Sequence, residues 1–180
     1  MNACNGKNGL VSQIKVRKML LHPPTPLNLS DLQREAYRLF KLSPSCTLSI
    51  AENLYLSATI SYPRTSSQKL PLSIDYKKFI TCLSEVNNNY ESLSAALLSK
   101  DRLLPNEGIK TDPAHPAIYP IGEKPDRRQL DLMHFKIYAL IVRRFFANFG
   151  DPAVNQHTIA LIDINGRYVL KSEGKSNIYE

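Results

Sequence analysis

The stretch from residue 99 to residue 125 most constrains the fold, because it is long and rich in residues that break regular structure. Its breakers are Pro105, Gly108, Pro113, Pro116, Pro120, Gly122 and Pro125. Proline fixes φ and removes a hydrogen-bond donor, so repeated prolines exclude a helix or a central strand here. A connection of this length inside a compact domain is usually functional or disordered. We therefore expect a loop that separates two groups of regular elements.

Helical periodicity is found on both sides of this loop. Ser30-Asp-Leu-Gln33 is a capping box that opens a helix to about Lys41. A second helix starts near Ser43-Pro44, since proline suits the first turn, and the chain turns extended at Thr59. Further helices are expected at residues 75–83, 90–98 and 126–149, the last being the longest.

Strand patterns lie near the two ends of the chain. A polar N-terminal segment leads into strand-like alternation from Gln13 to Leu21, and a proline-rich connector follows to Pro26. Near the C-terminus, Asn165-Gly166 is the strongest short hairpin signal, flanked by strands at 157–164 and 167–171. An isolated hairpin is marginal in water, so we expect its sheet to be incomplete in this chain. The predicted fold class is mainly α, an α+β fold with a short β-hairpin.

The balance of charge favours an anionic partner. Lysine and arginine number 23 against 16 acidic residues, which gives a formal charge of +7 and an isoelectric point near 9.3. Nucleic acid is the commonest partner of such a chain, although charge alone leaves a basic protein without a polyanion equally open.

Other classes of function lack their usual sequence signals. The chain has no apolar run near the roughly 20 residues of a membrane span and no secretory signal core. Its three cysteines are widely spaced, as in a reduced cytosolic protein, and no His or acidic set has metal-ligand spacing. We therefore expect a cytoplasmic protein with no membrane partner and no metal site of its own.

Tyr62 and Arg64 are suited to attack on a phosphodiester. A tyrosine hydroxyl has an ordinary pKa of about 10, so it needs a cationic setting and donors on the phosphoryl oxygens. Residues two apart in an extended segment point the same way, so both side chains can face one phosphate. Additional candidate phosphate donors are Ser61, Thr65, Ser66, Ser67 and Lys69. The alternative is a packing tyrosine beside a surface loop, since the chain has nine tyrosines.

His115 is the second candidate, in the segment Thr111 to Pro120. An imidazole near a phosphate can donate a hydrogen bond or carry positive charge, and Asp112 can orient it. A lone loop histidine is more often an exposed bystander. Arg34 and Arg38 lie one turn apart on the first helix and are candidates for DNA contacts.

Four segments together resemble the archaeal branch of the type IA DNA topoisomerases, in order and in spacing. They are Pro23 to Ala36, Ser49 to Tyr55, Ile60 to Pro71 and Asp112 to Pro120. The resemblance implies that Tyr62 is the nucleophile, Arg64 positions the scissile phosphate, and His115 assists near it. It also implies that Glu52 faces the DNA, and that Mg²⁺ is bound by an acidic Toprim module that nothing in this chain matches. One departure is Ile121, where the family commonly has Thr or Ser.

The resemblance also implies an architecture. Residues 1–26 would be a polar segment, strand and connector; residues 27–42 and 126–150, helices of a DNA-binding base; residues 43–125, a winged-helix-like domain that carries Tyr62; and residues 153–180, the start of a β-rich gate. The implied reaction is relaxation of negatively supercoiled DNA without ATP, by cutting one strand. Open alternatives are a non-catalytic single-stranded DNA-binding remnant, one half of a split enzyme with Toprim on a separate chain, or part of a reverse gyrase.

Overall fold

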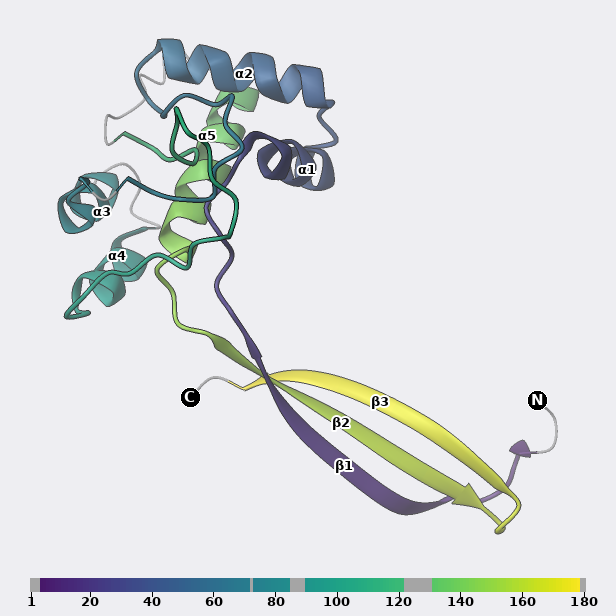
Figure 1. The fold of residues 1–180 in the computed structure, drawn as a ribbon. Coiled ribbons are helices and arrows are strands. Elements are labelled where there is room, and N and C mark those ends of the chain that lie inside the picture. The colour runs from purple at the N-terminus through teal and green to yellow at the C-terminus, as the bar shows by residue number, and fades with distance from the viewer. Residues whose placement is uncertain (1–3, 72, 85–89, 122–130, 179–180) are drawn as a thin grey trace. The chain divides into compact units, whose positions relative to one another are not determined.

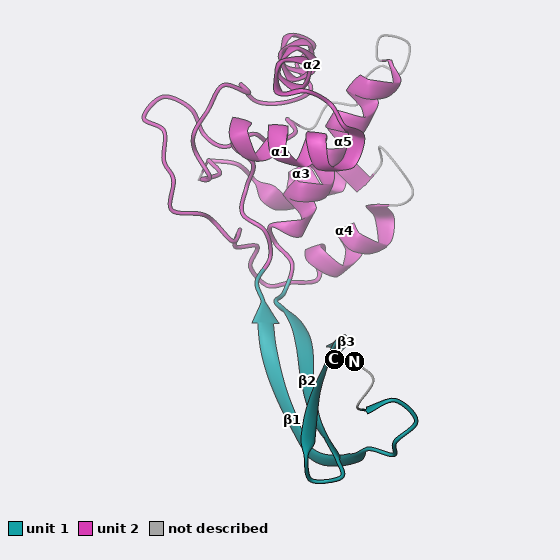
Figure 2. Ribbon diagram, turned by 90° about the vertical axis from the view of Figure 1, so that its right-hand side faces the viewer, with its two compact units in different colours: residues 1–22, 151–180 teal, residues 23–150 magenta. Residues whose placement is uncertain are grey.

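The computed structural model describes residues 4–71, 73–84, 90–121 and 131–178. The described residues form five helices and a three-stranded antiparallel sheet, which confirms the α+β prediction (Figure 1). Two compact units divide the chain (Figure 2). Unit 1 comprises residues 1–22 and 151–180, and unit 2 comprises residues 23–150.

Unit 1 is the antiparallel sheet, with strand order β1-β2-β3. The strands are β1 (Leu10–Leu21), β2 (Ala153–Ile164) and β3 (Tyr168–Ile178). The predicted hairpin joins β2 to β3, and Asn165 and Gly166 both adopt positive φ, 56° and 66°, as a type I′ turn requires. The Asp163 carboxylate fixes this turn by accepting a hydrogen bond from the Gly166 N–H at 2.9 Å.

The N-terminal strand is longer than predicted and has an unexpected partner. It begins at Leu10 rather than at Gln13, and it pairs with β2, with a register irregularity between Val11 and Gln13. The sequence does not predict this pairing, because the periodicity within a segment does not reveal which other strand it pairs with. β2 is consequently the central strand, and its residues are half-buried while those of β1 are exposed.

Unit 2 contains all five helices. They are α1 (Leu29–Phe40), α2 (Pro44–Leu56), α3 (Tyr76–Ser84), α4 (Glu91–Leu98) and α5 (Leu132–Ala147). Helix α5 runs through the middle of the unit and is buried on every side from Ile137 to Val142 (Figure 1). The core around it includes Leu32 on α1, Leu54 on α2 and Ile80 on α3, each fully buried.

Two helix starts differ from the predictions. Helix α1 is capped by Asn28, whose side chain accepts a hydrogen bond from the Asp31 N–H, and not by a Ser30–Gln33 box. Asn28 and Ser30 are both residue types that cap helices, and the buried Asn28 is the one that does so here. Helix α5 begins at Leu132, because Asp131 is extended and its side chain accepts hydrogen bonds from the N–H groups of Met133 and His134. The expected start at Asp126, with residues 127–130, lies outside the described residues.

The predicted loop is irregular but firmly joined to the segment after α2. Between α4 and residue 121 the structure has no helix or named strand, as expected, and residues 122–125 lie outside its description. Isolated bridges pair Leu27 with Ile118 and Ile60 with Pro120. Further backbone bonds run from the Ser61 N–H to the Tyr119 carbonyl, 2.9 Å, and from the Ala117 N–H to the Lys69 carbonyl, 2.8 Å. Two segments far apart in sequence thus lie side by side and form one surface.

Candidate active site

The turn after α2 aims the chain into the candidate site. Ala58 adopts a left-handed conformation, φ 56°, which reverses the chain direction at the end of the helix. Thr59 then donates two hydrogen bonds to the Leu54 carbonyl, from its N–H at 3.0 Å and from its hydroxyl at 2.7 Å. The hydroxyl of Ser61 donates to the Ala117 carbonyl and accepts from the Tyr119 N–H. The backbone that leads into Tyr62 is therefore fixed both to the end of α2 and to the loop.

Helix α2 contacts the Tyr62–Arg64 segment through two side chains one turn apart. The Tyr55 and Tyr62 rings meet edge to face with centroids 5.2 Å apart. Nε and a terminal nitrogen of Arg64 each lie 2.6 Å from one carboxylate oxygen of Glu52. Tyr62 and Arg64 thus both contact α2, although the segment is bent at Pro63, where the Thr65 N–H donates to the Pro63 carbonyl at 3.0 Å. That both side chains face one phosphate stays a prediction.

His115 reaches the same place from the loop. Its ring lies against the Tyr62 ring, with centroids 4.5 Å apart and planes tilted by 50°. Tyr62 and His115 are therefore in contact, although 53 positions of sequence separate them, and Arg64 lies two residues from Tyr62. His115 is exposed and Tyr62 is half-buried, so a ligand can reach both side chains from solvent.

Thr65 and Ser66 have structural hydrogen bonds in this arrangement. The buried Thr65 hydroxyl donates to the His115 carbonyl at 3.2 Å and accepts from the Ser67 N–H at 3.0 Å. The Ser66 hydroxyl lies 3.1 Å from the Thr111 carbonyl and 3.2 Å from a carboxylate oxygen of Asp112. Both residues were expected as phosphate donors; here their hydroxyls join the two segments.

Asp112 is the most perturbed acid of the site. Backbone N–H groups of Ala114, Ser66 and His115 donate to its carboxylate and lower its pKa to about 2. This carboxyl group is therefore ionised at neutral pH.

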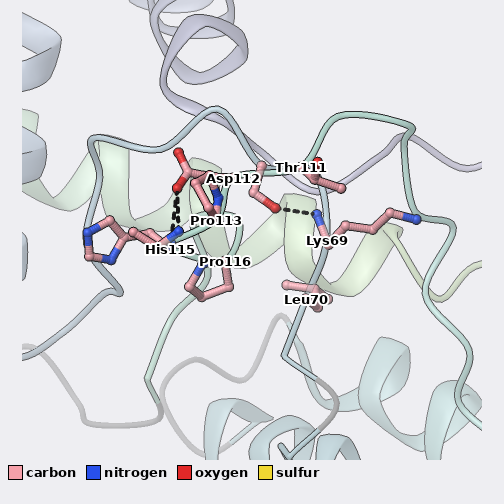
Figure 3. Close-up of a pocket in the computed structure, with 9 residues that line it drawn as sticks. Lys69, Leu70, Thr111, Asp112, Pro113, His115 and Pro116 are labelled. Carbon is pink, nitrogen blue, oxygen red and sulfur yellow. Dashed lines mark hydrogen bonds between the residues drawn. The ribbon is translucent and has the colours of Figure 1, made fainter.

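Lys69, Arg34 and Arg38 lie outside the Tyr62 contacts. Lys69 pairs with Glu107 at 3.2 Å and lines a pocket of about 240 Å³, which Asp112 and His115 also line. In Figure 3 the His115 ring and the Lys69 ammonium point away from each other, at opposite ends of this pocket. On α1, Arg34 pairs with Asp31 and Arg38 with Glu35, each three residues away. These two arginines are largely exposed, and their contribution to DNA binding stays a prediction.

Tyr55 is the residue of this cluster that the sequence analysis missed. Helical spacing assigns it to the apolar face of α2, yet it is 42% exposed and covers one side of Tyr62. The available signal was its position three residues after Glu52, which the family resemblance already directs towards DNA.

Neither a metal cluster nor a membrane helix is found in the part of the chain that the structure describes. Among those residues, no three His, Cys, Asp or Glu side chains gather as a metal site would require. The expectation that Mg²⁺ binds elsewhere stays a prediction. No helix of the described ranges is long and apolar enough to cross a membrane.

Comparison with known proteins gives one consistent result. A family model described as DNA topoisomerase matches residues 1–180. DNA topoisomerase 1 of Aeropyrum pernix is 46% identical over 91% of this chain and 24% of that protein. DNA topoisomerase 1 of Pyrococcus horikoshii is 45% identical over 92% of this chain and 24% of that protein.

A solved structure supports the same relationship. The full-length topoisomerase I of Thermotoga maritima superposes with a TM-score of 0.68 and 26% identity, over 97% of this chain and 29% of that one. The chain thus spans about a quarter of the length of the curated relatives that it matches. By its family match and its archaeal relatives, this chain belongs to the type IA DNA topoisomerase family.

Proposed function

We propose that this chain carries the strand-cleaving site of a type IA DNA topoisomerase, with Tyr62 as the nucleophile. The observation that carries the proposal is the contact of the Tyr62 ring with the His115 ring from the loop, beside Arg64, which Glu52 on α2 holds two residues from Tyr62. The names of the relatives, DNA topoisomerase 1, support DNA as the substrate. A basic chain with a charge of +7 is consistent with that substrate.

In the proposed reaction, the Tyr62 oxygen attacks a phosphorus atom of one DNA strand. A bond forms between this oxygen and phosphorus, the bond from phosphorus to the 3′ oxygen breaks, and the phenol proton ends on that 3′ oxygen. The 5′-phosphotyrosine conserves the energy of the phosphodiester, so reversal by the 3′ hydroxyl needs no ATP. Passage of another strand before reversal relaxes negative supercoils.

Arg64 and His115 have distinct roles in this scheme. Arg64 first separates from Glu52 and binds the phosphate in its place. It then donates hydrogen bonds to the phosphoryl oxygens as charge develops on them. His115, against the Tyr62 ring, is close enough to donate to the same phosphate. Thr65, Ser66, Lys69, Arg34 and Arg38 are proposed DNA-side contacts, and Glu52 is proposed to face the DNA as the group that the phosphate displaces from Arg64. Mg²⁺ and a Toprim-bearing segment or chain are proposed partners, and no step is assigned to them.

The family resemblance supports a role for each segment of the chain. We propose residues 27–42 and 126–150 as parts of the DNA-binding base and residues 43–125 as the winged-helix-like carrier of Tyr62. Residues 1–26 are proposed as the entering segment and residues 153–180 as the start of the gate. The proposed setting is the nucleoid, where the DNA partner is found.

The test detects covalent attachment of the cleaved DNA strand to the protein. The chain is incubated with a 3′-end-labelled single-stranded oligonucleotide and Mg²⁺ and then denatured, so that label on protein reports the phosphotyrosine. The same assay uses a chimera in which this chain replaces the matching segment of the Aeropyrum pernix enzyme. We expect labelled protein in the chimera and none after Tyr62→Phe. Label that survives this substitution contradicts the proposal, and DNA binding without label in either setting favours a non-catalytic binding module.

A further inference from the structure

Asp112 joins two segments of the candidate site through one carboxylate. Its Oδ1 accepts from the N–H groups of Ala114 and His115, at 3.0 and 3.1 Å. Its Oδ2 accepts from the N–H of Ser66 and lies within bonding distance of the Ser66 hydroxyl, both at 3.2 Å. One oxygen therefore shapes the turn that holds His115, and the other fixes the end of the Tyr62 segment.

Other chemical roles for this carboxylate fit poorly. Both oxygens are engaged by N–H donors, which hold the pKa of Asp112 at about 2, so it is a poor proton acceptor at neutral pH. It belongs to no metal-binding cluster of the described residues. Among these residues it also forms no ion pair, since its partners are three backbone N–H groups and one hydroxyl.

The overall pairing of the two segments does not depend on Asp112. Backbone bonds such as Ala117 N–H to Lys69 carbonyl, 2.8 Å, and Ser61 N–H to Tyr119 carbonyl, 2.9 Å, join them independently. Thr65 adds a hydroxyl bond to the His115 carbonyl. Loss of the Asp112 carboxylate therefore leaves the fold intact and loosens only the turn from which the His115 ring extends.

We propose that Asp112 is a positioning residue for strand cleavage, which holds the His115 ring against Tyr62 by fixing the His115 turn to Ser66. The expected effect on strand cleavage rests on the proposed function, whereas the expected effect on the contact between the His115 and Tyr62 rings does not. The nearest catalytic side chains move when this carboxylate is lost, although Asp112 itself touches neither phosphate nor the reacting oxygen.

The geometric arm of the test needs no catalysis. In the full chain, nuclear Overhauser effects between the His115 and Tyr62 ring protons report their contact. We expect these signals to be lost in Asp112→Ala and weakened in Asp112→Asn, because an amide keeps one acceptor oxygen and loses the other. Tyr62→Phe keeps the ring and serves as the positive control. Unchanged signals in Asp112→Ala overturn the proposal whatever the activity.

The catalytic arm measures adduct formation in the chimera. A misplaced group costs roughly up to 100-fold in rate, so we expect a fall of about 10- to 100-fold in Asp112→Ala and a smaller one in Asp112→Asn. Oligonucleotide affinity should not weaken, since the variant removes a negative charge. Asp101→Ala is the matched control: this exposed carboxylate has no hydrogen bond or ion pair among the described residues. A rate that stays at the wild-type value while the ring contact is lost also overturns the proposal.

Discussion

The guanidinium of Arg64 is held by the carboxylate of Glu52, with two of its nitrogens 2.6 Å from the same oxygen. Arg64 is 52% exposed and Glu52 36%. An exposed pair of this kind is worth only about 0–1 kcal/mol, so a phosphate can displace Glu52 at little cost. In the proposed function, the pair holds Arg64 in place until the DNA phosphate replaces Glu52.

Glu52→Gln should tighten binding of a single-stranded oligonucleotide by up to about fivefold, because it removes a competitor worth at most about 1 kcal/mol. Fluorescence anisotropy at low and high salt measures this, with the exposed Glu91→Gln on α4 as control. Weaker binding would instead show that Glu52 contacts the DNA directly.

Arg64→Ala should slow adduct formation in the chimera by about 10²–10³-fold, the usual cost of losing one preorganised donor to a developing oxyanion. Arg64→Lys should recover part of that loss, since lysine keeps the charge but not the two-pronged geometry. An unchanged rate in Arg64→Ala would remove this residue from the site.

Leu54→Ala should lower the free energy of unfolding by about 2–5 kcal/mol, because Leu54 is fully buried in the core beneath the site. Leu56→Ala, on the same helix but 79% exposed, should change it by less than about 0.5 kcal/mol. Urea unfolding followed by circular dichroism compares the two variants, and equal effects would contradict the burial of Leu54.

Ala58→Gly should stabilise the protein by about 0.5–1 kcal/mol. A left-handed conformation costs a non-glycine residue about 1–2 kcal/mol, and glycine's greater freedom in the unfolded chain offsets part of the gain. Ala95→Gly, at a site inside α4 that is also exposed, should destabilise by about 1 kcal/mol. Thermal unfolding gives both signs, and a loss of stability in Ala58→Gly would refute the strained turn.

The carboxyl group of Asp112 should titrate near pH 2, well below its ordinary 3.8. Because its pKa is lowered in the folded state, its contribution to stability is complete above pH 3.8. That contribution falls as the pH drops through 2. The carbon-13 shift of the carboxyl group measures this titration, and a midpoint near 3.8 would mean that the N–H bonds do not form.

Local sequence signals were enough to predict the regular elements. Helical spacing, the Asn165-Gly166 turn and the proline-rich loop each depend on a few neighbouring residues, so the elements were recognisable without a structure. Exact starts were less predictable, because Asn28 and Asp131 compete as caps with nearby Ser and Asp residues.

The site was predictable as a set of residues but not as a geometry. Spacing indicated that Tyr62 and Arg64 share a face, and family resemblance added His115 and Glu52. The ion pair of Glu52 with Arg64 and the cover that Tyr55 provides depend on how α2 packs, which no local pattern encodes.

The pairing of β1 with β2 has a consequence during synthesis. Ser12 on β1 bonds to Leu161 on β2, 149 residues further along the chain, whereas β2 and β3 are joined by a short turn. At about 5–20 residues per second, β1 leaves the ribosome roughly 7–30 s before its partner. Throughout that interval its apolar residues Ile14, Val16 and Leu20 have no strand to pair with. Lys15, Arg17 and Lys18 are interleaved with these apolar residues, and charges in such positions disfavour aggregation of an unpaired strand.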